Sequence, residues 1–405
     1  MKTYRNLFKK MTTPEMVKKA ALDAAEGKTH RPEVMGFFMN FDRAYEFVVA
    51  CANDPNYRPC ENNQHEIIDG NNNKKREIEK PQFCPEQVLH HMLVEPFKEV
   101  LLNGLYEQVY GCLPQKVLKV DPVTRKVITK NFGPHAAIKQ LTKWVQVKKK
   151  IYVGVTDIHH AYGSVHIKTL ADMMAEVIKD KQWLRLTYAF LHYYPNNPDN
   201  NETYGLILGH YTSPWFFNFY LKKFDHYMAA QPEIKYMRFA DNIFIVGTNK
   251  RKVHKAMDAM KIYLHDNLKL ELNSCTQVFR FEYVDKSGKV RGRAIDCLGV
   301  IIHHNRLGLR KSILKRMRRK AKKIKLKDHS VNWHDAASML SRISWVRCTD
   351  TFTYYVRNIR SNIKIKRLKN RVRNHIKKIQ PISMERRKKI NEGLAKSQRL
   401  SGDKA

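Results

Sequence analysis

The sequence is poor in acidic residues, in paired cysteines and in long apolar runs, and each shortage narrows the function classes that remain. Its 405 residues include 38 Asp and Glu against 75 Lys and Arg, which gives a formal net charge of +37. So many positive side chains repel one another unless a bound polyanion neutralises them, so nucleic acid is the expected partner. Composition alone leaves a ribosome-associated or merely basic protein open as the alternative.

The seven cysteines never form a Cys-x-x-Cys pair, and their number is odd. Because the N-terminus does not resemble a secretory signal, they are predicted to be reduced thiols of a cytoplasmic protein. Histidines lie near Cys84 in "FCPEQVLHH", but a zinc site needs four convergent ligands and no second half is evident. No apolar run reaches the roughly 20 residues that cross a bilayer, so a soluble protein without a membrane partner is expected.

The chain does contain enough apolar residues, 43%, to build the cores of two or three compact units. The Thr-capped, amphipathic "TTPEMVKKAALDAAEGK" predicts helix near the N-terminus, and "CPEQVLHHMLVEPFKEVLLNGLYEQVY" predicts another helix. Alternation around Asp-Pro-Val-Thr in "KVLKVDPVTRKVITK" predicts a basic β-hairpin. From residue 135 to 300, strands and helices alternate without a glycine-rich phosphate loop, which indicates an α+β core.

A strongly basic stretch follows this core. The segment "RKSILKRMRRKAKKIKLK", residues 310–327, has 11 basic residues in 18, and a second basic stretch runs over residues 364–389. Such runs more commonly form the solvated face of a helix or a disordered tail. Ile313, Leu314, Met317 and Ala321 instead mark one apolar stripe, which favours a packed helix whose other face meets phosphates.

Two acids stand at the ends of predicted strands. In "KYMRFADNIFIVG", residues 235–247, Asp241 and Asn242 separate two apolar runs, and "KKKIYVGVTDIHHAYGSV" ends a strand at Asp157, shortly before the aromatic Tyr162. A strand end beside a hairpin can place two carboxylates on one rim of a sheet, where hard divalent cations bind. Each signal is weak alone, because Asp ends many strands and Asp-Asn is an ordinary turn dipeptide.

The order of segments over residues of about 70 to 325 resembles the reverse transcriptase family. "TDIHHAYGSV" resembles the first palm motif, "YGLILGHYTSPWFFNFYLKKFDHYM" the second, and "YMRFADNIFIV" the Tyr-x-Asp-Asp hairpin. "NLKLELNSCTQVF" and "AIDCLGVIIHHNRLGLRKS" resemble the fourth motif and the primer-gripping hairpin, and "KKREIEKPQFCPEQVLHHMLV" resembles the fingers segment. The resemblance implies an α+β right-hand polymerase fold.

The resemblance also implies a division of the chain into domains. The expected parts are an N-terminal helical extension over 1–65, fingers over 66–145, a palm with an antiparallel sheet over 146–307, a basic helical thumb over 308–390 and a basic flexible tail over 391–405. The palm is expected to carry a fingers insertion at about 166–204.

The function that the resemblance implies is that of an RNA-directed DNA polymerase. Its expected partners are an RNA template, a DNA or RNA primer and deoxynucleoside triphosphates, and its expected cofactor is a pair of Mg²⁺ ions, for which Mn²⁺ can substitute. The implied metal ligands and catalytic residues are Asp157, Asp241 and, as a weakened third position, Asn242. The implied nucleotide-binding residues are Tyr162, Lys74, Arg76, Gly209 and Ser213. The implied template and primer contacts are Leu208, Pro214, Asn218, Arg238, Leu298, Gly299, Arg310, Lys311, Lys315 and Arg318.

Several of these residues also have an ordinary structural reading. Tyr162 is either a gate that excludes a 2′-hydroxyl or a core residue. Arg238 pairs either with template phosphate or with Glu233. The basic residues Lys74, Lys75, Arg76 and Lys80 either contact the triphosphate or form a solvated loop.

Departures from the family pattern suggest both a subgroup and an alternative function. Leu208 stands where most members have Gln, which is typical of reverse transcriptases from diversity-generating retroelements. Those prokaryotic or phage-encoded enzymes make frequent errors at adenines and work with a small accessory protein, although Pro214 stands where they usually have Gln. Asn242 removes one metal-binding charge, and Cys275 replaces an expected lysine proton donor, for which Lys269 is a possible substitute. The alternative function is therefore an attenuated, reverse-transcriptase-like RNA-binding subunit of a ribonucleoprotein.

Overall fold

The computed structural model describes most of the chain, in ranges separated by short gaps. These ranges are residues 2–29, 31–60, 63–68, 75–114, 116–120, 127–192, 203–327 and 330–377, together with residues 388 and 392. Within them, no helix is long and apolar enough to cross a membrane.

Short helices open the chain, as the sequence predicts. Thr13 caps the second of them by accepting a hydrogen bond from the backbone N–H of Met16, and Pro14 follows where its missing N–H costs nothing. The N-terminal segment shares one core with the fingers and the palm: the backbone N–H of Phe8, for example, donates to Asp180 Oδ2 at 2.8 Å. The helices are α1 (Leu7–Met11), α2 (Pro14–Ala24), α3 (Pro32–Met39) and α4 (Phe41–Asn53).

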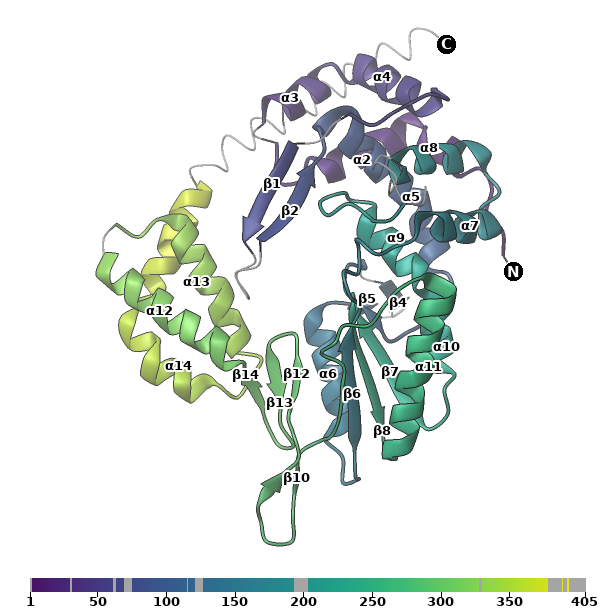
Figure 1. The fold of residues 1–405 in the computed structure, drawn as a ribbon. Helices are drawn as coiled ribbons and strands as arrows, with labels where there is room; N and C mark the ends of the chain where they lie inside the picture. Colours follow the sequence, from purple (N-terminus) through teal and green to yellow (C-terminus); the bar gives the residue numbers. More distant parts are fainter. Residues whose placement is uncertain are drawn as a thin grey trace.

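The predicted helix after residue 84 is confirmed as α5 (Val88–Leu102), which is buried on nearly all sides. It contacts α1, α2 and α9 and follows the π-helical turn η1 (Phe83–Gln87). A two-stranded hairpin of β1 (Asn63–Ile68) and β2 (Lys75–Lys80) extends beside these helices in Figure 1.

The palm is a five-stranded sheet in the order β3-β7-β8-β6-β9. The expectation of an antiparallel sheet holds for four strands, but β3 joins the edge parallel to β7 and corrects that expectation for the fifth. The strands are β3 (Val109–Tyr110), β6 (Tyr152–Asp157), β7 (Ile234–Phe239), β8 (Asn242–Gly247) and β9 (Gln277–Arg280).

Strand β8 shows why the sheet needs cover on both faces. Ile243 and Ile245 belong to one hydrophobic core with α10 and α11, whereas Phe244 and Val246 belong to a second core with α6 and the C-terminal helices. This alternation follows from the two-residue period of a strand. The helices between β6 and β9 are α7 (Ile167–Val177), α8 (Lys181–Leu191), α9 (Ser213–Tyr220), α10 (Lys222–Ala229) and α11 (Lys250–Leu268).

Two further hairpins form separate two-stranded sheets, one between β3 and β6 in the sequence and one after β9. The predicted hairpin over residues 116–130 is confirmed as β4 (Lys116–Val120) and β5 (Val127–Lys130), which precede α6 (Pro134–Val145). Its predicted basic side chains lie outside the described residues. After the palm come a hairpin of β10 (Tyr283–Val284) and β11 (Val290–Arg291), then a small sheet of β12 (Ile295–Cys297), β13 (Val300–Ile302) and β14 (Leu307–Leu309).

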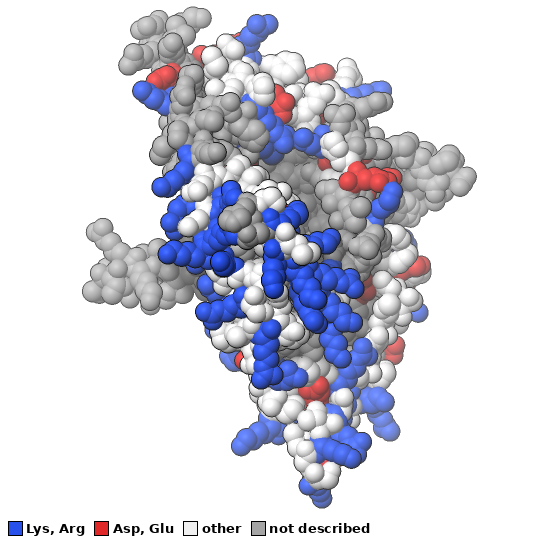
Figure 2. Space-filling model, turned by 90° about the vertical axis from the view of Figure 1, so that its left-hand side faces the viewer, with Lys and Arg blue, Asp and Glu red and all other residues white. Residues whose placement is uncertain are grey.

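The strongly basic stretch forms the helix that its apolar stripe predicts, α12 (Lys311–Lys327). Met317, Ala321 and Ile324 are buried in the second core, while most of the lysines and arginines stay exposed. It packs with α13 (Trp333–Val346), α14 (Phe352–Asn358), the 3₁₀ turn η3 (Arg360–Asn362) and a helical run over residues 365–377. Figure 2 shows lysines and arginines gathered over this side of the molecule, with few acids among them.

Candidate active site

The structure places the two predicted acids at the same end of neighbouring central strands. Asp157 is the last residue of β6, and the strand register sets it opposite Asn242, the first residue of β8. Asp241 occupies the β7–β8 turn, and its backbone carbonyl accepts a hydrogen bond from the N–H of Ile158 at 3.3 Å. Both carboxylates are half-buried. Asp157 and Asp241 together are called the acidic rim below.

Two amide side chains donate hydrogen bonds to the carboxylates of the acidic rim. Asn242 Nδ2 donates to Asp241 Oδ1 at 2.9 Å, and Asn273 Nδ2 donates to Asp157 Oδ2 at 3.2 Å. The backbone N–H of Asn273 also donates to the carbonyl of Asp157 at 2.9 Å. Each amide therefore orients one carboxylate of the acidic rim. Asn273 was not among the residues predicted from the sequence, although it stands in the fourth motif.

The donor set of the acidic rim suits magnesium better than a softer metal. Mg²⁺ is commonly held by one or two carboxylates, with water and substrate phosphate oxygens completing its shell. Among the described residues, no group of three or more His, Cys, Asp and Glu side chains could hold a metal ion. Asp157 and Asp241 thus fit a Mg²⁺ ion that shares its shell with a phosphate-bearing substrate.

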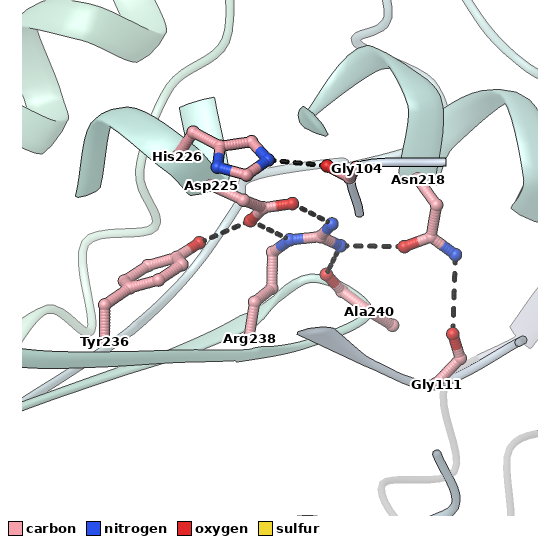
Figure 3. A network of polar contacts seen from close by, with 8 residues as sticks. All are labelled: Gly104, Gly111, Asn218, Asp225, His226, Tyr236, Arg238 and Ala240. Carbon is pink, nitrogen blue, oxygen red and sulfur yellow. Dashed lines mark hydrogen bonds and ion pairs between the residues drawn. The ribbon is translucent and has the colours of Figure 1, made fainter. Parts of the chain in front are cut away.

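A buried arginine supports the turn that carries Asp241. The guanidinium of Arg238 is fully buried and donates to both oxygens of Asp225, at 2.8 and 2.7 Å. Its Nη1 also donates to Asn218 Oδ1 at 3.0 Å and to the carbonyl of Ala240 at 2.8 Å. Burial lowers the pKa of Arg238, but the charge and hydrogen bonds of Asp225 outweigh that effect and raise it. Figure 3 shows this guanidinium between Asp225, Asn218 and Ala240.

The same network extends to the neighbouring strands. The hydroxyl of Tyr236 donates to Asp225 Oδ1 at 2.8 Å, and Asn218 Nδ2 donates to the carbonyl of Gly111 at 3.4 Å. Ala240 has a left-handed backbone, with φ of 51°, which is uncommon for a residue with a side chain. The hydrogen bond from Arg238 to its carbonyl therefore stabilises an unfavourable turn conformation immediately before Asp241.

Two predicted template contacts are corrected by this arrangement. Arg238 has 0% exposure and does not reach a template phosphate, and its alternative partner Glu233 pairs instead with Lys252 at 3.2 Å. Asn218 is 2% exposed, with its amide committed to Arg238 and Gly111. Both predictions failed because a polar residue in an apolar strand or helix looks the same in sequence whether it faces a ligand or a buried charge.

Tyr162 lies close to the acidic rim, on the side of β3. Its ring stacks on Phe217 with centroids 5.0 Å apart, and its hydroxyl contacts the thiol of Cys112. Burial, and next the charges of Cys112 and Asp241, raise the pKa of Tyr162. Cys112 was not predicted from the sequence; burial and then Asp241 raise the pKa of its thiol.

The second motif forms a loop against the fingers hairpin. The carbonyl of Leu208 accepts a hydrogen bond from the backbone N–H of Glu79 in β2 at 2.9 Å. Gly209 has φ of 111°, and a Cβ atom at this position would lie 1.9 Å from the carbonyl oxygen of Glu79. Glycine therefore permits the loop and β2 to meet backbone to backbone.

Ser213 and Pro214 begin α9 just after this loop. The hydroxyl of Ser213 is buried and donates to the carbonyl of Ile207 at 2.6 Å, so it holds the loop and does not face a nucleotide, which corrects its predicted role. Pro214 is half-buried at the first turn of the helix. Of the fingers residues, Lys74 lies outside the described residues, and for Arg76 the backbone, but not the side chain, is described in β2.

The residues predicted to grip primer lie between the small sheet and α12. Leu298 and Gly299 form the β12–β13 turn, and Arg310 binds both oxygens of Asp296 beside it, at 2.6 and 2.8 Å. Arg310 therefore braces this turn. The other predicted contacts on α12, Lys311, Lys315 and Arg318, are exposed, as are most of the basic residues of this helix.

Comparison with known families agrees with the arrangement of the palm. Residues 107–302 match the family described as "Reverse transcriptase (RNA-dependent DNA polymerase)". Over these residues the chain belongs to the reverse transcriptase family. The matched segment runs from β3 to β13 and contains the acidic rim, Tyr162 and the Leu208–Gly209 loop. The expected fold class, an α+β right-hand polymerase, is confirmed.

Solved structures similar to the chain include telomerases. The apo telomerase of Candida tropicalis truncated from its C-terminal domain is 10% identical, with 61% of this chain and 54% of that chain covered and a TM-score of 0.41. The telomerase of Candida albicans in complex with a TWJ fragment of telomeric RNA is 11% identical, with 85% and 60% covered and a TM-score of 0.42. The apo telomerase of Candida tropicalis is 9% identical, with 73% and 58% covered and a TM-score of 0.41.

The chain covers less than two thirds of the length of each of these telomerases. No curated protein sequence matches the chain.

Proposed function

We propose that the protein is an RNA-directed DNA polymerase that works through Asp157 and Asp241, with activity attenuated by Asn242. The supporting observation is the meeting of these two carboxylates at one end of the palm sheet, within the segment that belongs to the reverse transcriptase family. Two Mg²⁺ ions are the proposed cofactor, and bound there they would activate a primer 3′-hydroxyl and neutralise a triphosphate. Mn²⁺ can take their place.

The chain's own residues supply orientation in this proposal. Asn273 and Asn242 fix the rotamers of the two carboxylates, and Arg238 holds the turn that presents Asp241. Tyr162, packed on Phe217, is proposed to meet the incoming sugar and exclude a 2′-hydroxyl. The exposed face of α12 is proposed to meet the phosphates of template and primer, with Lys311, Lys315 and Arg318 as its contacts.

The test is deoxynucleotide incorporation on a primed RNA template, in Mg²⁺ and in Mn²⁺. The native protein is expected to incorporate nucleotides slowly, and Asp157→Ala is expected to abolish incorporation. Asn242→Asp is expected to increase the rate, because it adds a metal-binding carboxylate and removes the amide that donates a hydrogen bond to Asp241. A native protein that incorporates nothing with either ion, even in the presence of its RNA and cellular partner, would refute the proposal.

The second candidate function is a polymerase-shaped RNA-binding subunit of a ribonucleoprotein. The observation that favours it is the missing third acid: an amide stands beside Asp241, and no group of three metal-binding side chains occurs among the described residues. Only the polymerase requires the carboxylate of Asp157. RNA binding that survives Asp157→Ala is expected for both functions and does not separate them.

We further propose that the protein acts as the low-fidelity reverse transcriptase of a prokaryotic or phage-encoded diversity-generating retroelement, in the cytoplasm and with a small accessory protein. Leu208 supports this proposal, because an aliphatic side chain at this place cannot make the hydrogen bonds of an amide that aligns template and nucleotide. Leu208→Gln is expected to lower the error frequency at template adenines, and Leu208→Met to leave it unchanged. Sequencing the products checks both variants, and identical error spectra for native protein and Leu208→Gln would contradict the proposal.

A further inference from the structure

A basic cavity lies at the opposite end of the palm sheet from the acidic rim. It has a volume of about 450 Å³ and is lined by residues 145–151, residues 280–284 and His304. We call it the palm-end cavity. Tyr152 and Asp157 are the two ends of β6, so the cavity lies roughly 16 Å along the strand from the acidic rim, at about 3.3 Å per residue. It is therefore separate from the proposed polymerase site.

The lining of the palm-end cavity is dominated by positive charge. Lys148, Lys149 and Lys150 form an exposed run on one wall, and Arg280 stands on the other. Within the lining, Glu282 is the one acid, and its carboxylate is engaged by His303 Nδ1 at 3.0 Å and by the backbone N–H of His304 at 3.2 Å. Four lysine and arginine side chains thus face one carboxylate that already has partners.

The neighbouring β10–β11 hairpin extends this positive surface. Lys286, Lys289, Arg291 and Arg293 are exposed along it and just beyond it, and its Asp285 is paired with Arg291 at 3.0 Å. The hairpin is the lowest element in Figure 1, and the lower tip of the molecule in Figure 2 carries several lysine and arginine side chains among uncharged ones. The cationic surface therefore continues from the cavity onto a protruding element.

Aromatic rings stand among these cations. The guanidinium of Arg280 lies 3.4 Å from the ring centroid of Tyr283, and Lys150 Nζ lies 5.4 Å from that of Tyr152. Tyr283 is half-buried and lines the palm-end cavity, whereas Tyr152 lies outside the lining and packs against the first core. Basic grooves interleaved with aromatic rings bind single-stranded nucleic acid, because the phosphates meet the cations and unpaired bases stack on the rings. A membrane or an acidic protein would bind the cations but would have no bases to stack on the rings.

We propose that the palm-end cavity and the β10–β11 hairpin bind a single-stranded segment of RNA outside the path of primer and template. This binding does not depend on polymerase chemistry, since its residues lie at the far end of β6 from Asp157. The protein would then have a second RNA-binding site besides the proposed template path. This site would keep an RNA molecule bound while another part of that RNA is copied.

The test measures binding of an unstructured single-stranded RNA to full-length Asp157→Ala protein, so that failure of the polymerase proposal does not affect it. A primed RNA duplex is added first to occupy the proposed template path. The site variant replaces Lys148, Lys149 and Lys150 by Ala, and the matched control replaces Arg251, Lys255 and Lys261 by Ala. The control residues are equally exposed on α11, so both variants lose the same charge.

The site variant is expected to bind the RNA about tenfold more weakly, and its salt slope, log Kd against log salt, to fall by about 2, which is the effect of three lost phosphate contacts on a single strand. The control is expected to change little. Tyr283→Ala should weaken binding several-fold while Tyr283→Phe, which keeps the ring, should not. Polyglutamate should compete poorly with the RNA.

Three results would overturn the proposal. Equal losses in the site variant and the α11 control would mean that net charge alone attracts RNA. Equal affinities for Tyr283→Ala and Tyr283→Phe would mean that no base stacks there. Polyglutamate competing as well as RNA would assign the surface to an acidic protein partner.

Discussion

The guanidinium of Arg238 is a buried charge that the fold uses to position a turn. Removing two opposite charges from water costs several kcal/mol per ion, so a buried pair is weak evidence for stability by itself. The pair with Asp225 fixes the position of the Arg238 guanidinium, which also donates hydrogen bonds to Asn218 and to the carbonyl of Ala240. The turn that presents Asp241 is thereby tied to α9 and α10.

Replacing Arg238 by Met is therefore expected to destabilise the protein strongly. The substitution leaves the carboxylate of Asp225 buried without its counter-ion, which costs about 3–5 kcal/mol. Denaturant unfolding measures the loss. The control is Lys252→Ala, which breaks the exposed pair with Glu233 and should cost less than about 1 kcal/mol. Equal losses for the two variants would contradict a structural role for the buried pair.

At the scale of elements, the contact between the Leu208–Gly209 loop and β2 joins the palm to the fingers. Gly209→Ala would push a Cβ atom against the carbonyl of Glu79, so we expect the loop to separate from β2. Hydrogen exchange at the Glu79 amide, now bonded to Leu208, should accelerate. Gly36→Ala is the control, because open space surrounds this helical position and the change should stabilise α3 by about 0.5–1 kcal/mol. Unchanged exchange at Glu79 would show that the loop accommodates the methyl group.

Buried histidines at this junction make stability depend on pH. Burial lowers the pKa of His91 and of His210 to about 4, and burial also lowers that of His90. Unfolded histidine has a pKa near 6.5, so below that pH the unfolded chain gains protons that the folded chain does not bind, and stability falls as the pH is lowered. Each shift to about 4 is worth up to roughly 3 kcal/mol once the pH reaches 4.

His91→Phe is expected to weaken this pH dependence. The ring of His91 stacks on Tyr211 with centroids 3.7 Å apart, and Phe retains the stacking without the titrating group. Between pH 6.5 and 5 the variant should lose about 2 kcal/mol less of its unfolding free energy than the native protein. Denaturant titrations at the two pH values give the difference. Parallel losses in both proteins would exclude His91 as a source of the pH dependence.

Local pattern was enough to predict many of these elements but not the contacts between them. The 3.6-residue period predicted α5 and α12, and the strand ends predicted that Asp157 and Asp241 meet. Asp225 and Asn273 were missed because their partners, Arg238 and Asp157, come from other elements of the chain. Cys112 follows the parallel β3 strand with a left-handed backbone, φ 54°, and its thiol contacts Tyr162; nothing in the local sequence signals that contact.

At the scale of the whole molecule, the formal charge of +37 opposes folding unless counter-ions or a polyanion share the surface. Figure 2 shows one face on which this charge is concentrated, and α12 and the β10–β11 hairpin both contribute exposed cations. Self-repulsion and RNA binding are two effects of the same charges, but they respond to salt in opposite ways. Screening relieves repulsion within the free protein, whereas it weakens attraction to a polyanion.

The melting temperature is therefore expected to change with salt in opposite directions in the two states. Without RNA, it should rise as salt is added from low ionic strength, because screening reduces repulsion among exposed lysines and arginines. With saturating single-stranded RNA, it should begin higher, since a ligand at 100 times its Kd stabilises by about 2.7 kcal/mol, and then fall as salt releases the RNA. Scanning calorimetry with an uncharged polymer as the control gives both slopes. A melting temperature that does not change with salt in the absence of RNA would mean that repulsion among the basic residues does not destabilise the free protein. The net charge would then no longer be an argument for a nucleic-acid partner.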